Sequence, residues 1–308
     1  MELLTVDQIT ETPFIIANTQ SSTYQALKEE HIIPVFSKDN HPLIAQFQII
    51  ETMMDVLSGF KDLKPLDPQI RVSHPIMGRI PEARTKKAFE LLPHETTLYF
   101  ERMMFLIKIP NIRSLIEGKE LSLVIGGVKS YSWDNLGKDQ RASQHFKFFI
   151  GFQVKVCSNL CISTDGTILE FKTSSIDLLG KQIRLMVEGY SPEQHLSWME
   201  SLSNYSLTEG QFAHFLGKCR MYQHHLYKEE IPEILITDSQ LSSVTKGYYS
   251  DPHFSNNQGD ISLWNLYNLL TEANKSSYID GFLDRGVNAQ QISEELIRGL
   301  QSNQSWLI

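Results

Sequence analysis

The sequence predicts an α+β fold, with an antiparallel, β-rich half followed by a mostly helical half. Between residues 65 and 173 the apolar residues alternate with a period of two or form dense β-branched and aromatic runs. From residue 175 onward they recur at helical spacing instead. Strands and helices that are segregated along a chain favour α+β over an alternating parallel fold.

Three segments follow from these patterns. We expect an N-terminal arm and helix over residues 1–60, a basic β-rich core over 61–174 and an acidic helical region over 175–308. The last two segments could also form one integrated domain. Within the first segment, residues 43–59 have a helical pattern that Gly59 is suited to end.

Short strands are predicted at residues 69–73, 97–109 and 121–131 because these stretches are rich in β-branched and aromatic residues. We expect the second strand to end at Pro110, since proline cannot donate to a strand ladder. The glycine pair at 126–127 indicates a bulge or a close approach of two backbones.

The strongest β signal lies between residues 145 and 172. Even-numbered residues from Phe146 to Val156 are apolar and predict a core-facing side. The opposite side carries Lys147, Phe149, Gly151, Gln153, Lys155 and Cys157. Asp165 and Gly166 predict a hairpin turn, because a type I′ turn needs positive φ at both central residues. A return strand over 167–172 would follow.

The C-terminal half predicts a series of helices. Their expected starts are Asp177, Ser191, Thr208, Asp260 and Asn288. The clearest start is Ser191, which is followed by Pro192 at the first helical position. Residues 237–259 are rich in Ser, Asn, Gly and Asp and predict a long loop.

The composition is that of a globular protein, since 41% of the 308 residues are hydrophobic and 10% are aromatic. No apolar run reaches the roughly 18 residues of a transmembrane helix, and the N-terminus lacks the pattern of a signal peptide. Three cysteines suit a reducing compartment better than a disulfide framework. We therefore expect a cytoplasmic location and no membrane partner.

The net charge of −8 is unevenly distributed. Residues 61–155 contain 16 Lys and Arg against 10 Asp and Glu, a net charge of +6. The flanking segments, 1–60 and 156–308, have net charges of −6 and −8. A basic segment in an acidic protein is typical of phosphate recognition, although Lys and Arg that only solvate the outer face of a sheet give the same pattern.

The basic segment supplies the candidate nucleic-acid-binding residues. They are Arg71, Arg79, Arg84, Lys86, Lys87, Lys147, Phe149 and Lys155. Residues 79–87 form a polar loop between two predicted strands, which could grip phosphates. Lys147 and Lys155 share a strand face with Phe149, an arrangement suited to stacking the bases of a single strand. The alternative is that a helix of the C-terminal half covers Phe149, because a large exposed Phe is uncommon.

No motif predicts a catalytic or metal centre. Cys157 and Cys161 are four positions apart, about 13 Å on a straight strand, which is too far to share an ion. We interpret them, like Cys219, as packed thiols. The carboxylates are scattered along the chain, although folding could assemble a group that holds a divalent metal. We therefore predict no cofactor and assign no catalytic residue.

Several segments resemble an uncharacterised family of phage- and plasmid-like proteins. The resemblance covers residues 65–285, and the residues that carry it are the run from Tyr99 to Met103, the run from Leu121 to Tyr131, the segment from Phe148 to Cys161 and the run from Trp264 to Glu272. It implies a bacterial, phage or mobile-element origin. It supplies neither a reaction nor catalytic residues, because the family is a domain of unknown function.

These observations support three hypotheses about function. The first is a non-enzymatic accessory protein of a phage, plasmid or integrated element that binds single- or double-stranded DNA through its basic half. The second is a structural or protein-interaction module that assembles with a partner or as a homo-oligomer. The third is a metal-dependent, nuclease-like hydrolase whose carboxylate site forms only on folding.

Overall fold

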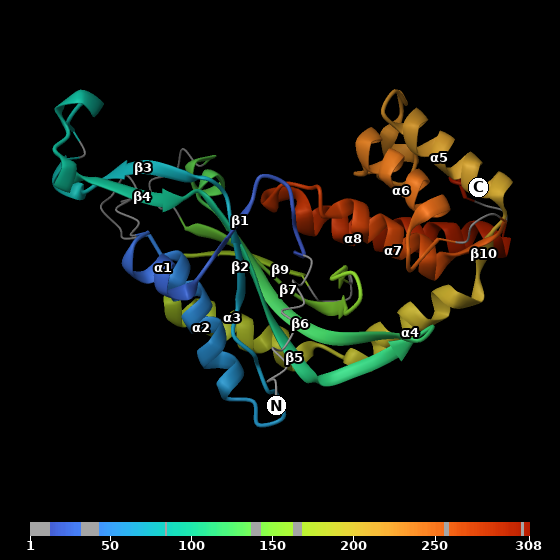
Figure 1. The fold of residues 1–308 in the computed structure, drawn as a ribbon, viewed down its shortest axis with the longest axis horizontal. Helices are drawn as coiled ribbons and strands as arrows, with labels where there is room; N and C mark the ends of the chain where they lie inside the picture. The colour runs from blue at the N-terminus through green and yellow to red at the C-terminus, as the bar shows by residue number, and fades with distance from the viewer. Residues whose placement is uncertain are drawn as a thin grey trace, which may run out of the picture.

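The predicted α+β class is confirmed in a computed structural model, which has antiparallel sheets in the N-terminal half and helices in the C-terminal half (Figure 1). The structure describes residues 13–31, 43–83, 85–136, 143–162, 168–255, 259–302 and 305–308. Within these ranges, no helix is both long and apolar enough to cross a membrane.

The described strands are β1 Gln20–Ser22, β2 Gln69–Val72, β3 Pro75–Arg79, β4 Thr96–Phe100, β5 Arg102–Ile116, β6 Lys119–Ser130, β7 Gln144–Val154, β8 Leu160–Ile162, β9 Ile168–Thr173, β10 Ser206–Leu207 and β11 Ile261–Ser262. The described helices are α1 Tyr24–Glu29, α2 Gln46–Ser58, α3 Ile176–Gly189, α4 Pro192–Ser201, α5 Glu209–Tyr222, α6 Asp238–Ser250, α7 Leu263–Asn274 and α8 Ile279–Ser302.

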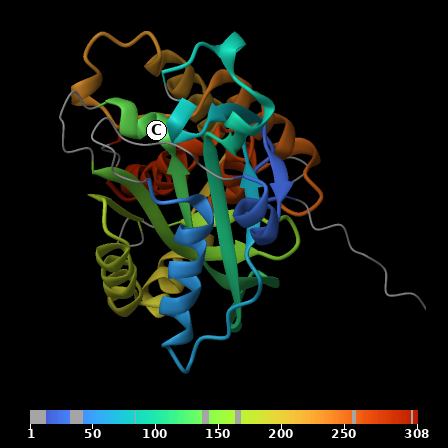
Figure 2. The ribbon, with the colours of Figure 1, turned by 90° about the vertical axis from the view of Figure 1, so that its left-hand side faces the viewer.

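A seven-stranded antiparallel sheet forms the centre of the molecule, in the order β1-β2-β5-β6-β7-β8, with β9 also paired to β7. β7 pairs with two short strands in succession. Its first half pairs with β9 and its second half pairs with β8. Seen from one end, the helices α1 and α2 lie beside the long strand β5 (Figure 2).

Helices cover both faces of this sheet. The even-numbered residues of β7 from Phe146 to Val154 are buried in the main core, together with residues of α2, α3 and α4. Phe149 belongs to a second core on the opposite face, which it shares with Phe282 and Leu283 of α8. The helical C-terminal half therefore packs against the sheet from both sides.

The close approach predicted at Gly126 is confirmed. A Cβ at this position would lie 2.1 Å from the carbonyl oxygen of Phe105 and 2.7 Å from the ring of Phe149. At Gly127 it would lie 2.7 Å from the ring of Phe148. Glycine is needed here because large aromatic rings from both neighbouring strands lie against β6.

Pro110 does not end its strand, contrary to the sequence prediction. The pattern over 97–109 instead divides at Glu101 into β4 and β5, and β5 continues through Pro110 to Ile116. The pairing of β5 with β6 shifts register between Ile109 and Arg113. Proline is tolerated at such an irregularity because no ladder hydrogen bond is required of it.

Three predictions in the helical half are also wrong. Residues 237–259 contain α6, which begins at a capping box formed by Thr237 and Gln240. Asn288 lies inside α8 instead of capping it, and its amide accepts from the Leu235 backbone at 2.8 Å. A polar residue can thus bond a neighbouring loop from within a helix. The N-cap of α7 is Ser262, not Asp260.

Other local predictions are confirmed. Ser191 and Thr208 cap α4 and α5, and Gly59 ends α2. The hairpin turn predicted at 165–166 lies outside the described residues.

Candidate functional site

A two-stranded hairpin projects beyond the central sheet and forms the candidate site, which we call the arm (residues 75–100). β3 pairs with β4 from Pro75 opposite Phe100 to Arg79 opposite Thr96. The chain between the strands forms short 3₁₀ turns. Figure 1 shows the arm at the upper left, extending away from the helices.

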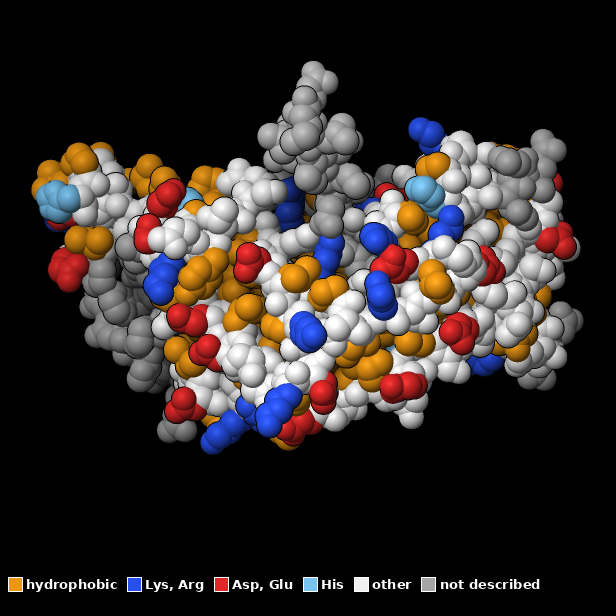
Figure 3. Space-filling model, turned by 60° about the horizontal axis from the view of Figure 1, so that its bottom comes forward, with side chains coloured by type: hydrophobic (Ala, Val, Ile, Leu, Met, Phe, Trp, Pro, Cys, Tyr) orange, Lys and Arg blue, Asp and Glu red, His pale blue; other side chains and the backbone are white. Residues whose placement is uncertain are grey.

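The arm exposes large apolar side chains. Phe89 is 81% exposed and Met77 is 70% exposed, and Leu92 and Leu98 are each about half exposed. Apolar side chains gather at this end of the molecule, at the left of Figure 3. Single exposed apolar residues are ordinary, but several on one projecting element indicate a contact surface.

Polar contacts within the arm hold its end in shape. Glu95 accepts from the Leu92 backbone at 2.9 Å and forms an ion pair with Lys86. These hydrogen bonds, first that from Leu92 and then that from Lys86, lower the pKa of the Glu95 carboxyl. The Arg79 guanidinium donates to the backbone oxygen of Lys86. Two cations of the arm, Arg79 and Lys86, therefore already have polar partners within the arm.

A third cation remains at the surface of the arm. Lys87 is exposed, and its ammonium lies 5.7 Å from the centre of the Phe89 ring. A cation over an aromatic face at this distance is weakly attracted to it. The pair presents a charge and an apolar surface side by side.

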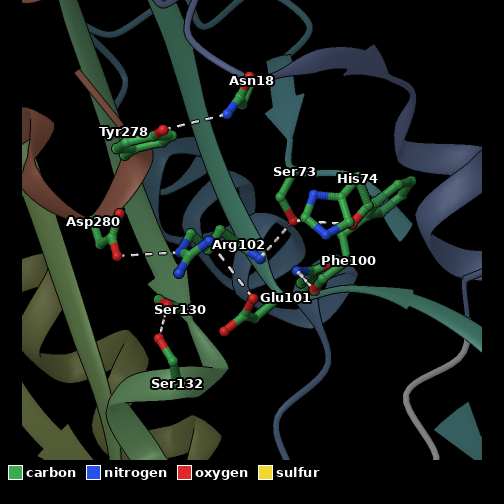
Figure 4. A network of polar contacts seen from close by, with 11 residues as sticks. Asn18, Ser73, His74, Phe100, Glu101, Arg102, Ser130, Ser132, Tyr278 and Asp280 are labelled. Carbon is green, nitrogen blue, oxygen red and sulfur yellow. Dashed lines mark hydrogen bonds and ion pairs between the residues drawn. The ribbon is translucent and has the colours of Figure 1, made fainter. Parts of the chain in front are cut away.

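The base of the arm is fixed to the sheet and to two helices (Figure 4). The Arg102 guanidinium donates to Asp280 of α8 at 3.2 Å, and the Arg102 backbone donates to the Ser73 hydroxyl at 3.2 Å. Gln46 of α2 donates to the Phe100 backbone at 2.7 Å. The arm thus extends from an anchored root.

The other cations predicted from the sequence lie elsewhere. Arg71 on β2 donates to the Ser21 hydroxyl of β1 and to the backbone oxygen of Thr19, which precedes β1. Lys155 lies a strand's length from the arm, 3.1 Å from Glu120 at the far end of the β5–β6 hairpin. In Figure 3, Lys and Arg are interspersed with Asp and Glu over this face of the molecule.

Lys147 and Phe149 face α8 instead of solvent. The Lys147 ammonium is 2.8 Å from Asp284 and 3.3 Å from Glu170. Phe149 is fully buried, so of the two alternatives for this ring the structure shows the covered one. Arg84 lies outside the described residues. Of the predicted residues that the structure describes, only Arg79, Lys86 and Lys87 are brought together, all on the arm.

A groove lies between α1, α2 and the start of β2. It has a volume of about 600 Å³. Its lining combines apolar or aromatic side chains with carboxylates, namely Tyr24, Ile50, Met54, Glu51, Asp55 and Asp67. The Tyr24 hydroxyl donates to Glu51 at 3.1 Å. Among the described residues, no group of three or more His, Cys, Asp or Glu is placed to hold a metal ion.

Among the buried ionisable groups outside the arm, Lys129 and His195 have lowered pKa values. Lys129 is fully buried, 2.7 Å from Asp134, and burial lowers the pKa of its ammonium to about 8. His195 bonds the Tyr190 hydroxyl through Nδ1 at 2.9 Å, and burial lowers its pKa to about 4. His195 is therefore neutral near pH 7.

The three cysteines are free thiols, as interpreted from the sequence. Cys161 and Cys219 are buried, and Cys157 is partly buried. Burial raises the pKa of Cys157 to about 11 and that of Cys219 to about 12. None of these thiols is activated as a nucleophile, because all favour the protonated form at neutral pH.

One protein-family model matches nearly the whole chain. Residues 4–307 match the model described as "Domain of unknown function, B. Theta Gene description (DUF3871)". The chain belongs to the DUF3871 family. No curated protein and no solved structure matches it. The match extends beyond residues 65–285 and agrees with a domain of unknown function, and it carries no information about phages or plasmids.

No pattern in the sequence of this DUF3871 chain predicts the apolar half of the arm. Phe89, Leu91 and Leu92 follow the basic loop directly, in a stretch that contains Pro93. They show no strand alternation or helical spacing because they lie in or between short 3₁₀ turns. The one feature of the sequence that could have indicated an exposed apolar surface is this apolar cluster within an otherwise polar segment between two strands.

Proposed function

We propose that this chain is a protein-interaction module that docks on a partner protein through the arm. The observation that supports this most strongly is the exposure of Met77, Phe89, Leu92 and Leu98 on a projecting hairpin. This is the second of the three functions considered from the sequence.

The energetics favour burial of these side chains in a complex. Fully burying a large apolar side chain contributes roughly 1.5–3 kcal/mol. Four such side chains could therefore offset a large part of the cost of association, which is on the order of 4–15 kcal/mol. The fixed base around Arg102 lowers that cost further, because the root of the arm is ordered before it binds.

Nucleic-acid binding is the second candidate, supported by Arg79, Lys86 and Lys87 on the same arm as Phe89. Two considerations favour a protein partner instead. Lys86 is paired with Glu95, and the arm also exposes Glu82 and Glu90, which would repel phosphates. A role in a phage, plasmid or integrated element is supported by the sequence resemblance alone.

Site-specific photo-crosslinking in the native cells tests the proposal. A crosslinking residue at position 89 is compared with one at Leu226, which is 85% exposed but lies between α5 and α6. We expect a discrete adduct from position 89 that protease destroys and that Met77→Ser reduces. No adduct above the Leu226 control would refute the arm as a docking element.

The same experiment separates the two candidates. An adduct that nuclease destroys would favour nucleic acid over protein. Binding of the purified chain to a labelled single strand, measured at two salt concentrations, then decides the matter. Phosphate contacts require affinity that falls as salt rises, and Lys87→Ala would reduce that slope.

A further inference from the structure

We infer that the arm binds its partner by strand addition, in which an extended segment of the partner protein pairs with the outer edge of β3, the side that faces away from β4. This inference rests on the proposed docking role of the arm and adds the chemical class of the bound segment. The direction of the main-chain hydrogen-bonding groups of β3 carries it.

The register of the hairpin determines which main-chain groups of β3 point away from β4. The Ile80 N–H donates to the Glu95 carbonyl at 2.9 Å, one position beyond the last pair of the ladder. In an antiparallel pair such hydrogen-bonded positions recur at every second residue, and the groups between them point outward. The N–H and carbonyl groups of Met77 and Arg79 therefore lie on the outer edge.

Two further residues agree with this register. Pro75 begins β3 opposite Phe100, at a position where the N–H of any other residue would point outward. Proline has no N–H, so it fits an outward position and would interrupt the ladder at an inward one. The Phe100 carbonyl accepts from the Gln46 side chain at 2.7 Å, which shows that it also points away from the partner strand.

The outer edge of β3 is available for pairing. Among the described residues, β4 is the only strand that pairs with β3, and no loop or side chain bonds the main chain of Met77 or Arg79. In Figure 1, β3 forms the upper edge of the arm. A row of unpaired main-chain groups is a template for another strand. A third strand would also stabilise the arm, because a two-stranded sheet alone is marginally stable.

The side chains of the arm define the segment further. Met77 lies directly opposite Leu98, and both are exposed. The other face is half-buried, with Ile76 opposite Tyr99 and the Tyr99 ring 6.1 Å from the ring of Tyr131 in the body. An added strand places alternate side chains beside its neighbours on each face. The segment should therefore be extended, with apolar and β-branched residues at alternate positions.

A different protein fits this edge better than a second copy of the chain. Antiparallel pairing of two β3 strands about Met77 would set Pro75 of each copy opposite Arg79 of the other. Because proline has no N–H, each Arg79 carbonyl would then lack its donor. A segment without proline at that position supplies every hydrogen bond that the edge can make.

Synthetic peptides test the inference on the partner's side. Linear decapeptides are selected from a random displayed library against the full-length chain, and each is remade with an N-methyl group at one position at a time. Strand addition predicts a period of two. Methylation at alternate positions should weaken binding about tenfold or more, through loss of a main-chain hydrogen bond, and methylation between them should be tolerated. Losses without this alternation overturn the inference.

Amide hydrogen exchange tests it on the chain's side. The Met77 and Arg79 amides should exchange rapidly in the free chain and slow down at least tenfold when a selected peptide binds. The inward Gly78 amide should be protected in both states. Exchange at Met77 and Arg79 that no selected peptide slows overturns the inference.

Two substitutions at one position separate the main chain from the side chain. Met77→Pro and Met77→Thr both remove the apolar side chain, but only Met77→Pro removes the outward N–H. We expect Met77→Pro to bind the selected peptides about tenfold more weakly than Met77→Thr. Protection of Gly78 in Met77→Pro verifies that its arm is paired, and where that protection is lost the exchange of the wild-type chain decides.

The proposed docking role and the mode of docking fail in different ways. A discrete protein adduct at position 89, together with peptides that show no alternation, removes strand addition and leaves the docking role. Absence of any adduct above the Leu226 control removes both. Protection of Met77 and Arg79 that rises with chain concentration, without peptide, would identify a second copy as the occupant and overturn the assignment to a different protein.

Discussion

The sheet body and the arm place the same residue types in opposite environments. Phe149 of the body is fully buried between β6 and α8, whereas Phe89 of the arm is 81% exposed. Lys147 of the body is paired with Asp284, whereas Lys87 of the arm lies exposed over a ring. Helices cover both faces of the body sheet, and the arm extends past them. A ring or charge in the body therefore contributes to folding, and on the arm it is available for binding.

The two phenylalanines provide the sharpest test of this difference. Phe149→Ala should lower the free energy of unfolding by about 3–5 kcal/mol, because it leaves a cavity in the second core. Phe89→Ala should change it by less than about 0.5 kcal/mol, since an exposed ring leaves no cavity. Urea unfolding of the monomeric chain at low concentration measures both. Similar losses for the two variants would mean that the arm packs on the body.

Histidine burial gives the next largest effect, and it depends on pH. Unfolded His195 takes up a proton near its ordinary pKa of about 6.5, whereas the folded residue does so only near 4. Between these values the unfolded state binds more protons, so the stability falls as the pH falls. The free energy of unfolding lost between these two pH values is about 3 kcal/mol, and the full stability is present above pH 6.5.

The measurement is a series of urea unfolding curves between pH 7 and pH 4. His195→Gln should flatten the pH dependence relative to the wild type, even if the variant is less stable throughout. His94→Gln, on the exposed surface of the arm, should retain the wild-type slope. An unchanged slope in His195→Gln would show that this imidazole does not carry the effect.

The strand alternation of β7 was predictable, but its consequence for function was not. Period-two spacing correctly separates Phe146 and Phe148 from Lys147 and Phe149. This spacing shows which residues share a face of the strand. It does not show whether another element of the fold packs on that face. The cover comes from α8, more than a hundred residues later, whose start the sequence had placed at Asn288 and not Ile279.

Sequence patterns predicted the features that depend on neighbouring residues alone. They did not predict the features that tertiary packing determines. Ser191 and Thr208 were predictable as caps because a side chain bonds an amide three residues on. The path of β5 through Pro110 depends instead on its partner β6, which absorbs the irregularity. The arm was predictable as a polar loop, but its exposed Phe89 had no periodic pattern to mark it.

Substitution of two lysines from the predicted binding face should have the smallest effects on the free energy of unfolding. These substitutions compare a buried charge with an exposed one. Lys147 is 9% exposed and lies within ion-pairing distance of both Asp284 and Glu170. Lys147→Ala should cost about 1.5–3 kcal/mol of unfolding free energy, as is usual for hydrogen bonds to charged groups. Lys155 is 70% exposed, and Lys155→Ala should cost less than about 1 kcal/mol.

Salt distinguishes the two pairs further. Screening acts strongly on exposed charges and weakly on buried ones, so the small Lys155 effect should vanish in high salt while most of the Lys147 effect persists. Urea unfolding at low and high salt, with both variants measured beside the wild type, checks this. If Lys147→Ala proves neutral and instead abolishes salt-dependent binding to a single strand, the strand face is a binding surface after all, and α8 must be able to leave it.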